Sequence, residues 1–116
     1  MSGLVLVRQK KGCEIQVFRR LDRPLERLRG LLGTGRDAKP VALMDCRSIH
    51  TFGMRYSLDI AFLSPVGQVL EVRRGVSAGR LLSNSLAWVT LERPHRCGRW
   101  LKAGETVKVT QIEGRR

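Results

Sequence analysis

Aromatic side chains are scarce in this sequence. They make up 5% of its 116 residues, whereas 42% of the residues are hydrophobic. A chain of this length typically forms one domain with a core of its own. We therefore expect a single domain over residues 1–116, with a core made mostly of leucine, valine and isoleucine.

Cysteines and long apolar runs are also few. Cys13, Cys46 and Cys97 are odd in number, widely spaced and without a CxxC pair, which argues against a disulfide framework or a zinc site. No stretch approaches the roughly 18 apolar residues of a membrane span. The apolar run at residues 4–7 is too short for a signal peptide, and no basic residue precedes it. We expect a cytoplasmic protein with no membrane partner, no metal and no cofactor.

Acidic residues are outnumbered by basic ones. The 22 lysines and arginines exceed the 10 acids, for a net charge of +12. Such a charge attracts phosphates and anionic surfaces without specifying any of them. A basic nucleic-acid-binding protein is therefore one alternative. Aromatic residues for base stacking are scarce and no recognised nucleic-acid motif is present, so a solvated charged surface is the more typical explanation of the charge. The candidate basic patch comprises a helix face with Arg23, Arg27 and Arg29 and a cluster of Arg93, Arg96, Arg99 and Lys102.

Hydrophobic patterning predicts several short strands joined mostly by turns. The expected strands cover residues 4–8, 14–18, 41–44, 58–63, 68–72, 86–92 and 106–112. A turn is expected at residues 10–12, and the turn at 64–67 should join two strands into an antiparallel hairpin. The predicted fold class is α+β, with a small, mostly antiparallel curved sheet or barrel.

One main helix is expected at residues 23–32. Asp22 suits its N-cap and Pro24 its first turn. Its apolar face would comprise Leu25, Leu28, Leu31 and Leu32. A short second helix is expected within residues 94–101.

The most informative stretch runs from residue 46 to residue 63. Its first half combines a thiol, an imidazole, hydroxyl groups and a glycine, and its second half is an apolar strand with a single carboxylate. We expect a polar pocket here. The candidate binding residues are Ser48, His50, Thr51, Arg55 and Asp59. Local backbone bonding by His50, surface exposure of Arg55 and a structural Asp59 are alternative interpretations.

An enzyme is a second alternative. Asp59 could orient the His50 imidazole as a general base. Cys46 lies four residues before His50 and could serve as a nucleophile, although a buried inert thiol is the more typical use of a cysteine. A metal site would need further ligands beside His50 and Asp59, such as Glu92 and His95. The sequence spacing of these residues does not match a known metal-binding pattern.

The segment Cys46-Arg47-Ser48-Ile49-His50-Thr51-Phe52-Gly53-Met54, with the strand at 58–63 and the turn at Gly67, resembles the DUF192 (UPF0127) family of small prokaryotic domains. The GLLG stretch at 30–33, Leu91-Glu92 and the turn at 101–105 extend the resemblance over about residues 15–110. The stretches at 64–66 and 93–98 depart from the family pattern. The resemblance implies a compact β-rich domain with one or two helices, in a family whose biochemical role is not established.

These observations favour an uncharacterised small binding or accessory domain. Its polar pocket would surround the CRSIHTFGMR segment, residues 46–55, and hold a small or peptidic anionic ligand. The partner would be a small molecule or another protein.

Overall fold

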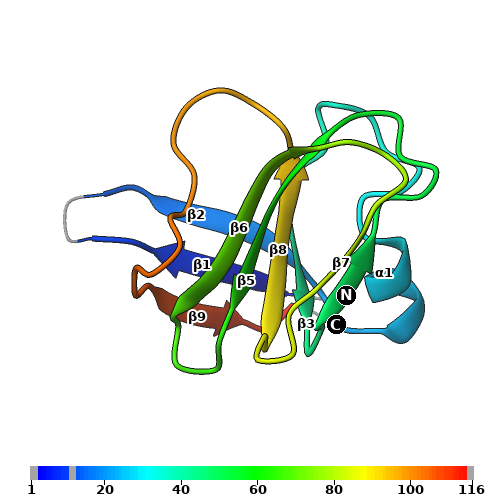
Figure 1. Ribbon diagram of the computed structural model, residues 1–116. Helices are drawn as coiled ribbons and strands as arrows, with labels where there is room; N and C mark the ends of the chain where they lie inside the picture. Colours follow the sequence, from blue (N-terminus) through cyan, green and yellow to red (C-terminus); the bar gives the residue numbers. More distant parts are fainter. Residues whose placement is uncertain (1–2, 11–12, 115–116) are drawn as a thin grey trace.

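A computed structural model describes residues 3–10 and 13–114, and within them most of the chain forms strands (Figure 1). Along the main sheet, in spatial order, lie β6 (Val69–Val76), β5 (Leu58–Leu63), β8 (Val89–Pro94), β3 (Val41–Met44), β2 (Ile15–Leu21), β1 (Leu4–Arg8) and β9 (Lys108–Ile112). A separate antiparallel ribbon pairs β4 (Ser48–His50) with β7 (Leu81–Ser83).

The main sheet curls until its two ends meet. A bridge joins Gln68 to Thr106, and the backbone N–H of Val69 donates to the Glu105 carbonyl at 2.9 Å. Neighbouring strands run antiparallel except β2 and β3, which are parallel. The result is a curled half-barrel. The predicted curved, mostly antiparallel sheet and the hairpin of β5 with β6 are confirmed.

The strand predictions hold best where a strand is buried or flanked by clear turns. The strands at 4–8, 41–44 and 58–63 have the predicted bounds, and the other four are shifted or differ in length. The ribbon strands β4 and β7 were expected to be loop, because three residues are too few to show periodicity. The expected turn at 10–12 lies partly outside the described residues.

The prediction of a main helix over residues 23–32 is wrong. α1 (Pro24–Arg29) has six residues and buries none of them, with Leu25 79% and Leu28 63% exposed. Gly30 ends the helix at a φ of 51°, so that Leu31 reaches the core from a turn instead of from a helical face.

The predicted N-cap and the predicted second helix are also wrong, whereas Pro24 does lie in the first turn of α1. Asp22 pairs with the Arg20 guanidinium at 3.0 Å, and the Glu26 carboxylate accepts the Arg23 backbone N–H at the start of α1. Residues 94–101 form no second helix, because the carbonyls of Arg96 and Arg99 accept bonds from arginine side chains instead of helical N–H groups. Within the described residues, no helix is long and apolar enough to cross a membrane.

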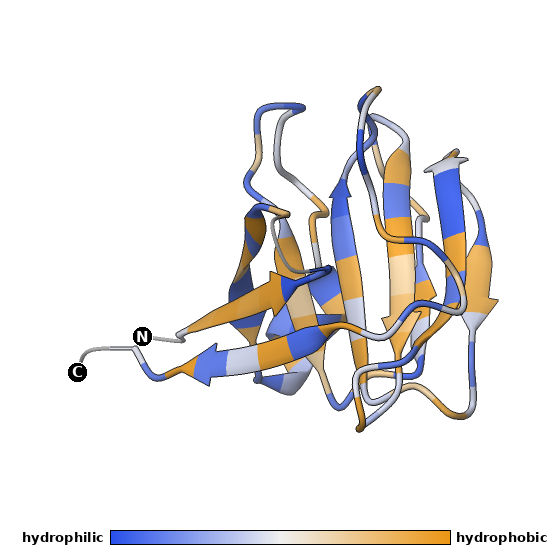
Figure 2. Cartoon of the chain, turned by 90° about the vertical axis from the view of Figure 1, so that its left-hand side faces the viewer, coloured by the Kyte–Doolittle hydropathy of each residue, from blue (hydrophilic) through white to orange (hydrophobic). Residues whose placement is uncertain are grey.

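The curled sheet separates two hydrophobic clusters. The first fills the hollow of the half-barrel with Phe18, Ala61, Leu91 and Trp100 among others. The second lies on the outer side of β3 and β5, beneath α1 and the β4–β7 ribbon, and includes Leu31. Figure 2 shows hydrophobic and hydrophilic residues alternating along many of the strands. β5 and β8 are buried along their whole length because both of their faces are covered.

Candidate functional site

A cavity of about 180 Å³ opens between α1, the β4–β7 ribbon and the outer face of the sheet. Its wall is partly apolar, with Ile49, Met54 and Leu58 facing the space. Its polar lining residues come from separate elements: Arg27 and Arg29 from α1, Ser48 and His50 from β4, and Glu92 from β8. Long-range folding therefore assembles this site from both ends of the chain.

Glu92 is the most unusual residue of the cavity. It is only 3% exposed and lies directly beneath Gly30, where an added Cβ would come within 2.8 Å of its Oε1. Burial raises the pKa of its carboxyl from 4.5 to about 7, and the backbone amide of Leu31 offsets part of that rise. The positive φ of Gly30 and its missing side chain make room for this acid.

Two further polar atoms face the same region without a partner. His50 Nδ1 and Arg27 Nε are buried, and neither has a hydrogen bond among the described residues. Both side chains are held in place by other contacts. Arg27 Nη1 donates to the Met44 and Asp45 carbonyls at 3.1 and 3.0 Å, and the His50 ring stacks on Phe52 at 5.5 Å. Leaving a buried polar group unpaired costs about 1–3 kcal/mol, so a water molecule or another hydrogen-bonding group at these atoms would stabilise them.

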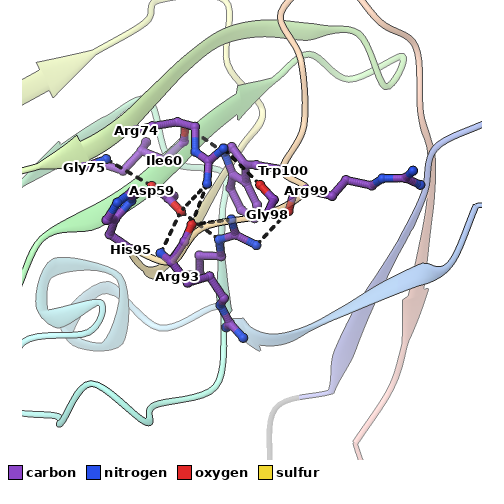
Figure 3. A network of polar contacts seen from close by, with 10 residues as sticks. Asp59, Ile60, Arg74, Gly75, Arg93, His95, Gly98, Arg99 and Trp100 are labelled. Carbon is purple, nitrogen blue, oxygen red and sulfur yellow. Dashed lines mark hydrogen bonds and ion pairs between the residues drawn. The ribbon is translucent and has the colours of Figure 1, made fainter.

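Asp59 lies at the centre of a different network (Figure 3). Its side chain is fully buried, and its carboxylate accepts bonds from Arg93 Nε at 2.8 Å, His95 Nδ1 at 2.7 Å and the Gly75 backbone N–H at 3.0 Å. Burial opposes ionisation of Asp59, but the bonds from His95, Arg93 and Gly75 outweigh it and hold the pKa of this carboxyl below 3.8. The carboxylate is therefore ionised at neutral pH.

The arginines of this network also fix the loop that follows β8. Arg93 donates to the Arg99 carbonyl at 3.0 Å and lies over the Trp100 ring at 4.5 Å, and Arg74 donates to the Arg96 carbonyl at 2.6 Å (Figure 3). Arg93 is thus engaged inside the fold, whereas Arg74 makes its contacts at the surface with a side chain that is 38% exposed. Arg96 and Arg99 keep exposed side chains beside a broad groove along β2.

The expected His50–Asp59 dyad is not formed. Asp59 pairs with His95, whereas His50 lies across the sheet beside Leu58. Successive side chains of a strand point to opposite faces, so Leu58 and Ile60 face the outer cluster with the cavity, and Asp59 faces the other way. The expected pocket is accordingly divided: Ser48 and His50 line the cavity, and Asp59 does not.

Thr51 and Arg55 do not line this cavity. Thr51 is fully buried, donates to the Ser77 carbonyl at 2.8 Å and accepts the Arg80 backbone N–H at 2.8 Å, which ties the central segment to the turn before β7. The Arg55 side chain is exposed.

Cys46 is buried, and its thiol donates to the Ser48 carbonyl at 3.2 Å. Burial raises the pKa of this thiol, which favours the unreactive protonated form. The described residues contain no group of three or more His, Cys, Asp or Glu side chains placed to hold a metal ion. Glu92 and His95, which were considered together as added ligands, serve opposite faces of the sheet.

Arg27 was considered only as part of a basic surface patch, and Glu92 was considered only as a metal ligand. The sequence contained one signal for Glu92, a carboxylate within the apolar run of residues 86–92. The pairing of Asp59 with Arg93 was missed as well, because it depends on the register of β5 against β8, two strands that are far apart in the chain and joined by no single turn. No local pattern indicates that register.

Fold and cavity together define a small, mostly β domain with a curled sheet and a recess of about 180 Å³ beneath a short helix. Two solved structures share this fold. A protein of unknown function from Novosphingobium aromaticivorans is similar with a TM-score of 0.68 and 20% identity, over 90% of this chain and 83% of that one. A candidate transcription regulator from Sinorhizobium meliloti has a TM-score of 0.66 and 13% identity, over 96% and 94%.

At these identities the likeness is one of fold alone. No known family model and no curated protein matches the sequence, so the resemblance to the DUF192 family stays a prediction.

Proposed function

We propose that this protein is a binding domain that holds a small ligand in the cavity beneath α1. The observation that carries the proposal is the convergence of a buried acid, Glu92, with the unpaired atoms His50 Nδ1 and Arg27 Nε on one cavity. A ligand with hydrogen-bonding groups would supply the partners that these atoms lack, and the apolar wall would cover the rest of its surface.

The size of the cavity limits what it holds. Pockets for drug-sized molecules range from about 300 to 1,000 Å³, and this cavity has about 180 Å³. It suits a molecule of a few heavy atoms, or one side chain or chain end of a peptide.

Catalysis has less support at this site. The Cys46 thiol is buried and engaged with a backbone carbonyl, and the buried Asp59 carboxylate pairs with His95 instead of His50. An activated nucleophile needs a base within hydrogen-bond reach, and no such pair involves Cys46 in the described residues. Binding is the simpler use of this arrangement.

A screen of small molecules by thermal shift tests the proposal, because a ligand that binds only the folded state raises its melting temperature. The screen is repeated on His50→Ala and on Arg36→Ala, which removes an exposed side chain outside the cavity. Ligands that stabilise the wild type and Arg36→Ala but not His50→Ala are expected. Hits that stabilise all three proteins equally, or a screen without hits, would contradict the proposal.

The nucleic-acid alternative stays a prediction about the exposed Arg96 and Arg99. Both would bind phosphates, and removing either guanidinium should reduce the slope of log affinity against log salt by about 0.7–0.9. The double change to glutamine is compared with the same change at Arg36 and Arg80, two exposed arginines outside the candidate patch. If both double variants reduce the slope of log affinity against log salt equally, the protein attracts nucleic acid by its general charge and has no defined site for it.

A further inference from the structure

We infer that the ligand is a monocarboxylate, which places its carboxylate among Arg27, His50 and Glu92 and its short apolar chain along Ile49 and Leu58. This inference rests on the proposed function and names the ligand class of the same cavity. The geometry supports it: the polar groups lie on α1, β4 and β8, and apolar side chains form the remaining wall.

The charges around the cavity favour an anion. The charged or titratable groups that face it are Arg27 and Arg29 from α1, His50 from β4 and Glu92 from β8. The Cys46 thiol lies outside it, in a recess that shares Arg27 and Ser48 with this cavity. Two guanidinium groups stand against one carboxyl. Arg27 Nε–H is an unused donor, and a guanidinium is the side chain best suited to a carboxylate.

Glu92 has to be protonated when the anion is bound. Two ionised carboxylates at hydrogen-bonding distance repel each other, but a protonated Glu92 donates its O–H to the ligand, so that the pair shares one proton. Because burial already raises the pKa of Glu92 to about 7, taking up this proton from solvent costs little near neutrality. One proton is therefore absorbed per ligand bound when the solution is more alkaline than this pKa.

The pH dependence follows from that proton. Affinity for a carboxylate should be nearly constant below the pKa of Glu92 and fall by up to about tenfold per pH unit above it. An amine of the same size should show the opposite trend, because it pairs with ionised Glu92. A neutral amide should change little.

The experiment is isothermal titration with butyrate, butyramide and butylamine at about pH 6, 7 and 8. Butyrate should bind tightest of the three at the lowest pH, and its affinity should fall about fivefold between the two higher values, because the protonated fraction of Glu92 falls by that factor. Glu92→Gln, which keeps a donor that does not titrate, should bind butyrate with little pH dependence. Glu71→Gln, which removes a carboxylate paired with Arg73 outside the cavity, should keep the wild-type profile.

Two sources of the carboxylate are separated by a second titration. A short peptide with a free C-terminal leucine is compared with its C-terminal amide and with butyrate. Tighter binding of the free-acid peptide than of butyrate assigns the site to peptide C-termini, and the reverse assigns it to small free acids.

Several results would overturn the inference. These are tighter binding of butylamine than of butyrate, affinity for butyrate that rises with pH, or an unchanged profile in Glu92→Gln. If that variant does not fold, the comparison of butyrate with butyramide in the wild type decides. Ligands found by the thermal-shift screen while all three probes fail would refute the carboxylate but leave the proposed function standing. Failure of both the screen and the probes would refute both.

Discussion

Replacing Asp59 by asparagine should destabilise the protein severely. The substitution keeps the shape of the side chain but removes a charge that three close donors share, at 2.7, 2.8 and 3.0 Å. The Arg74 guanidinium and the Arg96 backbone N–H also reach this carboxylate, each at 3.5 Å. Arg93 is only 6% exposed, so its guanidinium would be left as a buried charge without a counter-ion. Removing one partner of a buried pair costs about 3–5 kcal/mol, which is a large fraction of the roughly 5–15 kcal/mol that stabilise a typical domain.

Urea denaturation at neutral pH measures the loss, with the free energy of unfolding extrapolated from the transition. Glu71→Gln is the matched control: it removes a carboxylate that pairs with Arg73 at the surface at 2.8 Å, where the expected loss is below about 1 kcal/mol. A loss of less than about 1 kcal/mol for Asp59→Asn would refute the reasoning, because it would mean that the buried arginine needs no anion.

The same pair predicts a pH dependence with a definite sign. The pKa of Asp59 is lower in the folded protein than its ordinary 3.8, so its ionisation stabilises the fold above that pH. This stabilisation is lost as the pH falls through the folded value. The difference in unfolding free energy between wild type and Asp59→Asn should thus be constant around neutrality and shrink in stronger acid. A difference that grows in acid would contradict the assignment.

Three further changes test the cavity and the cysteines. The free energy of unfolding should fall by about 3 kcal/mol as the pH rises from 4.5 to about 7, because Glu92 is harder to ionise in the folded protein. Urea titrations of Glu92→Gln should not show this decline. An equal decline in both proteins would contradict the assignment to Glu92. Gly30→Ala should lower the free energy of unfolding by about 1–3 kcal/mol in the same assay, because a φ of 51° is unfavourable for alanine and the added Cβ would meet the Glu92 carboxyl. An unchanged free energy of unfolding would mean that the turn relaxes. Iodoacetamide labelling followed by mass spectrometry should modify the exposed Cys97 well before the buried Cys46, and early labelling of Cys46 would revive the nucleophile hypothesis.

The sheet was largely predictable from the sequence, whereas the helix was not. Buried strands such as residues 58–63 are marked by continuous apolar runs between turn residues, and the structure has them with those bounds. The leucines after Pro24 also follow a helical period, but this period says nothing about whether a neighbouring surface exists to cover them. Leu25 and Leu28 stay exposed because the chain leaves the helix at Gly30.

The site was predictable only in part, for a related reason. The segment around His50 was identified by its density of polar side chains, and the structure lines a cavity with Ser48 and His50. Asp59 was grouped with them because it is near in sequence, yet alternation along β5 turns it to the other face of the sheet. The true neighbours of His50 in the cavity, Arg27 and Glu92, are supplied by tertiary packing that no local pattern encodes.

Glu92 and Arg93 are adjacent in β8 but serve opposite sides of the sheet, the first in the cavity and the second on Asp59. Deleting a single residue ahead of the pair would bring the Arg93 guanidinium under Gly30, and inserting one would bring the Glu92 carboxylate against Asp59. β8 should therefore tolerate substitution at several positions but no change of length. In related sequences, gaps should collect in the loops on either side of this strand and leave the spacing between its two charges intact.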